Sequence, residues 1–173
     1  LDVDIPQFVT PDTRIALAHA AAMLFRQPSR SMDIVGITGT NGKTTTTFLL
    51  DWIVRSAGRS SGVIGTVETR FGDVAVASVR TTPESLRLQG LLARMRDVGT
   101  STVSMEVSSH AIALHRVDAV EFAVAAFTNL SQDHLDFHST LADYFDAKVR
   151  LFTELPARER IICIDDDYGR DLQ

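Results

Sequence analysis

The stretch Gly36-Ile37-Thr38-Gly39-Thr40-Asn41-Gly42-Lys43-Thr44 joins residues 33–38, a predicted buried strand, to residues 44–57, a predicted helix that ends at Gly58. A glycine-bearing turn between a strand and a helix is the setting in which a phosphate-binding loop works. We therefore predict that this stretch binds the phosphates of a nucleoside triphosphate. A glycine-rich turn that binds no ligand is the alternative, and the loop alone does not say which nucleotide binds.

Each residue type in this loop has a chemical reason for its place. Gly39 and Gly42 let the backbone turn tightly and aim consecutive N–H groups at phosphate oxygens, and the helix that follows adds the positive end of its dipole. Lys43 can reach the terminal phosphates, and the Thr44 hydroxyl can bind Mg²⁺. The strict pattern of such loops needs a glycine at position 37, so this chain, with Ile37, has a variant of the loop.

Helices and strands alternate along the rest of the chain. A first helix is predicted to start at Thr10-Pro11-Asp12 and to end before Pro28, and residues 28–31 resemble a linker. Further strands are predicted at 61–66, 102–107, 120–128 and 160–164, further helices at 84–97 and 141–152, and a hairpin around 71–79. This alternation predicts an α/β fold with a mainly parallel, doubly wound sheet.

The composition is that of an ordinary globular protein, with 173 residues, 45% of them hydrophobic and 23% charged, so one domain is expected. No stretch approaches the ~18 consecutive apolar residues of a membrane span. The single Cys163, expected in a buried strand, excludes a disulfide framework and suits the cytoplasm. The net charge of −5 and the scattered basic residues do not indicate a nucleic-acid-binding surface. The chain begins without Met, which is typical of an excised piece.

Polar side chains follow two further predicted strands, at the edge of the sheet where ligands of open α/β sheets gather. Glu106 closes the strand at 102–107, and His134 lies in the polar stretch after the strand at 120–128. The two side chains could meet near the phosphates, where a carboxylate and an imidazole suit a divalent cation bridging ATP oxygens. Taken singly, Glu106 could equally be a solvated charge and His134 a helix cap or a surface group.

Several long motifs resemble one protein family. They are residues 36–47, the triplet Thr81-Thr82-Pro83, Met-Glu-Val-Ser-Ser-His at 105–110, His-Arg-Val at 115–117, Phe-Thr-Asn-Leu-Ser-Gln-Asp-His-Leu-Asp-Phe-His at 127–138 and Tyr-Phe-Asp-Ala-Lys at 144–148. Together they closely resemble the central domain of the Mur ligase family, a phosphate-loop fold. The loop is shared with other Mur ligases and with folylpolyglutamate synthetase, whereas 105–117 and 129–148 resemble the MurE branch.

The resemblance implies an ATP-dependent amide ligase of peptidoglycan synthesis. Such an enzyme phosphorylates the D-glutamate side-chain carboxylate of UDP-MurNAc-L-Ala-D-Glu and joins the resulting acyl phosphate to the amine of a diamino acid, either meso-diaminopimelate or lysine. The implied cofactors are ATP and Mg²⁺. The implied enzyme is cytoplasmic and, at full length, monomeric, with no membrane and no nucleic acid as partner.

The resemblance also implies roles for particular residues. Lys43, His134 and Lys148 match catalytic positions, with Lys148 carried as a carbamate whose negative charge supports a cation. Thr44 matches a ligand of one Mg²⁺, and Glu106 and His134 match ligands of a second. A solvated helix lysine is the alternative for Lys148.

Two more sets of residues are carried over from the motifs. The nucleotide-binding set is Gly39, Thr40, Asn41, Gly42, Lys43, Thr44, Thr45 and Asn129. The substrate-binding set is Thr81, Thr82, Ser108 and Arg116, the last suited to an anion by its fork of donors. Ser109 and Asn129 are expected to position ligands or their neighbours, while His110, His115 and His138 have no case beyond motif membership. Trp52 is expected to pack its helix against the sheet.

The resemblance implies that residues 1–32 are the end of an interdomain linker and a first helix, and that 33–173 form an incomplete ATP-binding domain. The uridine-binding and amino-acid-binding domains of such ligases are missing from the chain, which is therefore expected to be inactive alone. Cys163 replaces an asparagine common in relatives, which could change adenine affinity. Two alternatives remain: another amide ligase, such as folylpolyglutamate or cyanophycin synthetase, or a nucleotide-binding module without catalysis.

Overall fold

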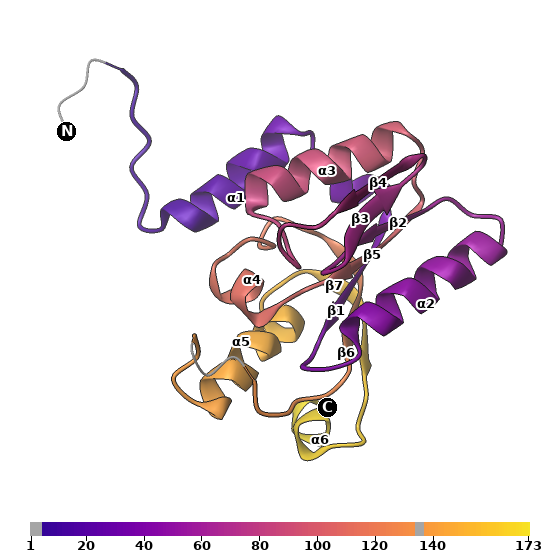
Figure 1. The fold of residues 1–173 in the computed structure, drawn as a ribbon. Helices are drawn as coiled ribbons and strands as arrows, with labels where there is room; N and C mark the ends of the chain where they lie inside the picture. The colour runs from indigo at the N-terminus through magenta and orange to yellow at the C-terminus, as the bar shows by residue number, and fades with distance from the viewer. Residues whose placement is uncertain (1–4, 134–136) are drawn as a thin grey trace.

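A computed structural model describes residues 5–133 and 137–173 of the chain. Its centre is a seven-stranded sheet in the order β4-β3-β2-β5-β1-β6-β7 (Figure 1). The strands are β1 Asp33–Thr38, β2 Ser61–Ile64, β3 Glu68–Phe71, β4 Val74–Ala77, β5 Thr102–Glu106, β6 Phe122–Phe127 and β7 Ala157–Ile162. β2, β5, β1, β6 and β7 are parallel, and the hairpin of β3 and β4 adds the antiparallel edge. The predicted mainly parallel sheet is thus confirmed.

Helices cover both faces of this sheet, as a doubly wound fold requires. They are α1 Thr13–Leu24, the 3₁₀ helix η1 Pro28–Ser31, α2 Lys43–Ser56, α3 Ser85–Asp97, α4 Ser109–Ala113, α5 Leu141–Thr153 and α6 Asp167–Leu172. The crossover from β1 to β2 runs in the opposite direction along the sheet from the crossovers that contain α3, α4 and α5. Because such crossovers are right-handed, α2 lies on one face and α3, α4 and α5 on the other (Figure 1).

Local signals set the ends of several helices. The Asp12 side chain accepts hydrogen bonds from the amides of Arg14 and Ile15, so it caps α1, which begins at Thr13, close to the predicted start. Gly58 and Gly99 follow α2 and α3 with φ of 74° and 78°, a left-handed conformation that glycine adopts without steric cost. These caps explain why the predicted helix limits are correct to within a few residues.

The main apolar core lies between the sheet and the helices α3, α4 and α5. Every residue of β5 is buried, and Leu88, Leu92 and Met95 of α3 are fully covered. β1 lies between β5 and β6, with Gly36 packed so closely on Phe122 that an added Cβ would lie 2.6 Å from the ring. The central strands are therefore rigidly held, and their carboxyl ends meet at one edge of the sheet.

Some expectations about the periphery were wrong. Residues 28–31 are not a linker but the helix η1, with Pro28 and Ser29 buried. Trp52 is 68% exposed on the outer side of α2 instead of packing on the sheet, because α2 turns its small and polar side, including Thr47, inward. Cys163 is half-buried just after β7 rather than inside a strand.

The last strand begins three residues earlier than predicted. β7 includes Arg158, Glu159 and Arg160, whose charges concealed the strand in the sequence. Among the described residues β7 pairs only with β6, so one edge is not covered by another strand and charged side chains can face solvent there. The short helices α4 and α6 were not predicted. None of the helices within 5–133 and 137–173 is long and apolar enough to cross a membrane.

The core predicts a clear stability difference between two leucines of α3. Leu92→Ala removes a fully buried side chain, so we expect the free energy of unfolding to fall by ~2–5 kcal/mol in urea titrations. Leu86→Ala, where the side chain is 46% exposed, is the matched control and is expected to cost less than ~1 kcal/mol. Equal losses for the two variants would contradict the described packing of α3.

Candidate active site

The loop between β1 and α2 has the backbone shape expected of a phosphate loop. Gly39 and Gly42 have φ of 138° and 85°, values that favour glycine. A Cβ on Gly39 would lie 2.0 Å from the Thr128 hydroxyl oxygen, so no larger residue fits. α2 begins at Lys43, directly after the loop, and its unpaired amides face the same space. The loop can therefore hold an anion.

Residues that follow β6 clamp this loop through its backbone. Asn129 accepts a hydrogen bond from the Asn41 amide at 3.0 Å and donates one to the Asn41 carbonyl at 3.1 Å. The Thr128 hydroxyl donates to the same carbonyl at 2.7 Å, and the Thr40 amide donates to the Asn129 carbonyl at 2.9 Å. Asn129 therefore shapes the loop, and its predicted role toward a ligand stays a prediction.

The two lysines of the chain, Lys43 and Lys148, meet at this loop. Both ammonium groups donate to the Gly39 carbonyl, at 2.8 Å and 3.1 Å, and Lys43 also donates to the Thr40 carbonyl at 2.8 Å. Lys148 is only 1% exposed, with its nitrogen 4.1 Å from the centre of the Tyr144 ring. It is therefore not a solvated helix lysine.

Burial lowers the pKa of both lysines, and the charge of Lys43 lowers the pKa of Lys148 further. Burial, with the nearby charge of Lys43, lowers the pKa of Lys148 to about 7, although Asp133 opposes the shift. Burial also lowers the pKa of Lys43, against the attraction of Glu106 and Asp133. A large fraction of Lys148 is thus a neutral, nucleophilic amine near neutral pH.

Glu106 lies at the end of β5 and is completely buried. Its Oε1 accepts hydrogen bonds from the Thr44 hydroxyl at 2.9 Å and from the Thr66 amide at 2.8 Å, and its Oε2 accepts one from the Thr66 hydroxyl at 3.0 Å. The alternative of a solvated charge is therefore wrong for Glu106. The strand pairing of β1 with β5 brings this carboxylate to the first turn of α2.

The donor atoms of Glu106 and Thr44 fit Mg²⁺. This ion uses oxygen ligands, commonly one or two carboxylates together with phosphates of the substrate. His134, the other predicted ligand, lies outside the described residues. Within the described part of the chain no group of three or more His, Cys, Asp or Glu side chains could hold a metal by itself. A cation here would therefore depend on oxygens that a nucleotide brings.

The predicted substrate residues form a connected group beside Glu106. The Thr82 hydroxyl is buried, donates to the Glu106 carbonyl at 2.8 Å and accepts from the Ser108 amide at 3.1 Å. Arg116 donates to the Thr82 carbonyl at 3.2 Å and pairs with Glu84 at 2.8 Å. Within the described residues the buried Arg116 Nε has no hydrogen-bond partner.

A cavity of about 370 Å³ brings most of these residues together. Predicted residues on its wall are Thr40, Asn41, Gly42, Lys43, Thr44, Thr45, Thr81, Glu106, Ser108 and Lys148. Gly39, Thr82, Arg116 and Asn129 do not line it. Ser109, expected to position ligands, also lines it, as do Thr66 and Tyr144, which were not predicted as site residues. Tyr144 lies one helical turn before Lys148, a spacing that could have revealed it, whereas no local pattern marks Thr66.

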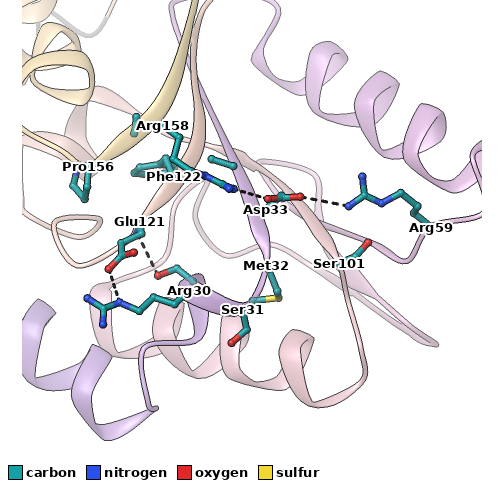
Figure 2. Close-up of a pocket in the computed structure, with 13 residues that line it drawn as sticks. Arg30, Ser31, Met32, Asp33, Arg59, Ser101, Glu121, Phe122, Pro156 and Arg158 are labelled. Carbon is teal, nitrogen blue, oxygen red and sulfur yellow. Dashed lines mark hydrogen bonds and ion pairs between the residues drawn. The ribbon is translucent and has the colours of Figure 1, made fainter.

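A second hollow, of about 700 Å³, lies at the opposite end of the sheet (Figure 2). Its charges are already paired: Asp33 contacts Arg158 at 2.5 Å and Arg59 at 3.4 Å, and Arg30 contacts Glu121 at 2.6 Å. Arg158, more than Arg59, lowers the pKa of Asp33. None of the predicted site residues lines this hollow, so we assign the chemistry to the smaller cavity at the phosphate loop.

The lowered pKa of Lys148 predicts a pH-dependent stability. Between pH 7 and ~10.4, the pKa of lysine in an unfolded chain, the unfolded chain binds a proton that folded Lys148 lacks. This contribution therefore raises stability as pH increases. In the Lys148→Met variant the free energy of unfolding should increase less steeply with pH, by up to ~1.4 kcal/mol per pH unit. Urea unfolding at pH 7, 8 and 9 in bicarbonate-free buffer measures it, and equal slopes for both proteins would refute the shift.

Comparison with known proteins assigns the family. Residues 37–173 match the Mur ligase middle domain. The chain is 50% identical over 168 residues to the UDP-N-acetylmuramoyl-L-alanyl-D-glutamate–2,6-diaminopimelate ligase of Streptomyces coelicolor, covering 97% of this chain and 33% of the relative. The ligase of the same name from Aquifex aeolicus is 45% identical over 168 residues, covering 97% of this chain and 35% of the relative. The chain thus spans about a third of these relatives.

Solved structures give the same result. A structure of a ligase of this name has a TM-score of 0.82 and 30% identity, covering 95% of this chain and 34% of the other. The folylpolyglutamate synthase of Mycobacterium tuberculosis has a TM-score of 0.67 at 16% identity, covering 91% of this chain and 43% of the other, so it shows a shared fold alone. The chain belongs to the Mur ligase family, of which it contains the middle domain.

Proposed function

We propose that this chain is the ATP-binding core of an amide ligase that adds a diamino acid to UDP-MurNAc-L-Ala-D-Glu. The observation that carries the proposal is the meeting of Lys43, Lys148 and the buried Glu106 around one phosphate loop. The ligases at 45–50% identity are named for 2,6-diaminopimelate, which makes it the favoured amine. In this proposal residues 33–173 are the nucleotide-binding part, and residues 1–32 lead into it.

The chain's own residues would hold and orient the phosphates. The loop amides and the Lys43 ammonium would bind the β- and γ-phosphates, and Lys43 would leave the carbonyls of Gly39 and Thr40 to do so. Thr44 would hold one Mg²⁺, and Glu106, together with the predicted ligand His134, would hold a second; such ions supply charge neutralisation when phosphate is transferred to a carboxylate. This carboxylate would become an acyl phosphate, which the amine attacks with release of phosphate.

Substrate recognition falls to the group beside Glu106. Thr81 and Ser108 line the cavity and offer hydroxyls to the muramoyl peptide. Arg116 lies outside the wall of this cavity and pairs with Glu84, and its guanidinium is of a type suited to an anionic group of that substrate. Thr82, whose hydroxyl already bonds Glu106 and Ser108, would position these residues.

Lys148 is proposed to carry a carbamate. Its neutral amine can attack CO₂, forming the N–C bond and releasing one proton, and burial favours the neutral amine near pH 7. The Lys148 nitrogen lies 3.1 Å from the Gly39 carbonyl that Lys43 also contacts, so a carbamate on this nitrogen would attract the Lys43 ammonium, whereas a Lys148 ammonium would repel it. A carbamate there could support the bound cation or the Lys43 ammonium.

Two other functions have weaker support. A folylpolyglutamate-type ligase shares the fold, and one such structure is titled as a complex with ADP and AMPPCP, but its identity of 16% carries no substrate argument. A nucleotide-binding module without catalysis would not need Thr44, Glu106 and Lys148 assembled at one cavity. The relatives at 45–50% identity favour the ligase.

The phosphate loop is tested by Lys43→Ala. Loss of a charge-assisted contact to phosphate should weaken ATP binding by on the order of 100-fold in calorimetric titration with Mg²⁺. Arg55→Ala, on the exposed side of the same helix, is the control and should bind as the unaltered chain does. Unchanged affinity of Lys43→Ala would rule out the proposed nucleotide site.

The carbamate is tested directly by carbon-13 NMR. In ¹³C-bicarbonate the chain should show one carbamate resonance from a side chain, and Lys148→Met should lack it. Lys43→Met is the control that shows which of the two lysines carries the carbamate, and the resonance should persist in this variant. A spectrum without the resonance, or one unaffected by Lys148→Met, would remove this assignment.

A further inference from the structure

Among the described residues, three hydrogen bonds hold the Glu106 carboxylate, and the turn between β2 and β3 supplies two of them. The Thr66 amide donates to Oε1 at 2.8 Å and its hydroxyl donates to Oε2 at 3.0 Å, so one residue binds both oxygens. The third bond comes from Thr44, the proposed ligand of a cation, whose hydroxyl is needed elsewhere when a cation is bound. The hydrogen bonds from Thr66 to Glu106 can therefore persist when a cation is bound.

Gly65 makes room for this arrangement. A Cβ at position 65 would lie 2.4 Å from Glu106 Oε1, 3.1 Å from Cδ and 3.3 Å from Cγ. The contacted atoms belong to the end of a side chain, so an alanine would push the carboxylate aside without displacing backbone. Gly65 and Thr66 together form a cradle that fits one position of the Glu106 carboxylate, and we call this pair the Glu106 cradle.

The Glu106 cradle keeps the Glu106 carboxylate from pairing with the nearby Lys43 ammonium. Glu106 is close enough to Lys43 for their attraction to raise the pKa of the lysine against burial. Yet Lys43 donates its hydrogen bonds to the carbonyls of Gly39 and Thr40, while Glu106 is bound by hydroxyls and an amide. A carboxylate without these donors would turn toward the ammonium, and both groups would then be withdrawn from a bound nucleotide.

The same turn reaches the proposed substrate residues. The hydroxyl oxygens of Thr66 and Thr81 are 3.0 Å apart, and both residues line the cavity. Thr82, the next residue, donates to the Glu106 carbonyl. The loop at 80–84 is thus linked to Glu106 in two ways. Thr81 reaches the Glu106 side chain through Thr66, and Thr82 contacts the Glu106 backbone carbonyl.

We propose that Gly65 and Thr66 are positioning residues that aim Glu106 at the nucleotide-bound cation and connect it to the substrate loop through Thr81. The inference rests on the proposed function. It assigns to this turn a part in cation-dependent nucleotide binding, while Thr66 itself need not touch the nucleotide.

The test compares two forms of one nucleotide on the full chain. Calorimetry measures the Kd for ATP with Mg²⁺ and for ATP in EDTA. Thr66→Val keeps the amide and the shape but removes the hydroxyl, so the Kd with Mg²⁺ should rise about tenfold. The Kd in EDTA should stay within about twofold. Thr66→Ser restores the hydroxyl and should return the Kd with Mg²⁺ to near its original value.

Two further variants complete the design. Gly65→Ala retains both Thr66 donors but displaces the carboxylate, so it should show the same selective loss with Mg²⁺. Thr153→Val, at the exposed end of α5, is the matched control and should change neither constant. Thermal unfolding of each variant confirms that it is folded, and if Thr66→Val is not, Gly65→Ala and Thr66→Ser decide the question.

The outcomes separate this inference from the function on which it rests. An unaltered chain that fails to bind ATP in either form overturns the proposed function and this inference with it. If the unaltered chain binds more tightly with Mg²⁺ and folded Thr66→Val and Gly65→Ala do the same, only the cradle is overturned. Equal losses in both forms also overturn it, because they would reflect general damage to the site. A selective loss that serine restores supports the cradle.

Discussion

The parallel pairing of β1 with β5 on one side and β6 on the other is the constraint on which the site depends. Register places Ile37 opposite Glu106 and Thr38 opposite Phe127, so three chain segments distant in sequence end at one level. Each end then contributes one component: β1 the phosphate loop, β5 the carboxylate and β6 the residues that clamp the loop. A shift of one residue in either pairing would turn these side chains to the other face of the sheet.

Charge is the second constraint, because two lysines and a buried glutamate line the same cavity. Lys148 responds with a pKa of about 7, whereas Glu106 is covered by hydroxyl and amide donors. Apolar residues at these positions would give a more stable core, since burying an amine or a carboxylate costs free energy of desolvation. Such costs are typical of sites where charge is used.

The fold and the loop could be predicted from sequence because their signals are local. Glycines 39 and 42, the helix cap Asp12 and the Val- and Ile-rich strands each specify structure within a few residues. Thr66 could not be predicted, because its role arises only when β2 and β5 pair and Gly65 meets Glu106. Trp52 was misassigned since a helical pattern alone does not show which side faces the sheet. His134 lies outside the described residues and stays a prediction.

The scarcity of lysine in this chain has a practical consequence. Fifteen of its seventeen basic residues are arginines, which do not react with reagents for amines, and the two exceptions both contact the Gly39 carbonyl. Apart from the amino terminus, any acylating label aimed at the surface would thus modify the proposed active site instead. Lys148, with its depressed pKa, would be the stronger nucleophile of the two, although its burial restricts it to small reagents. A label that reacts with the lysine side chains would therefore report on the proposed nucleotide site, whereas a label on the amino terminus would not.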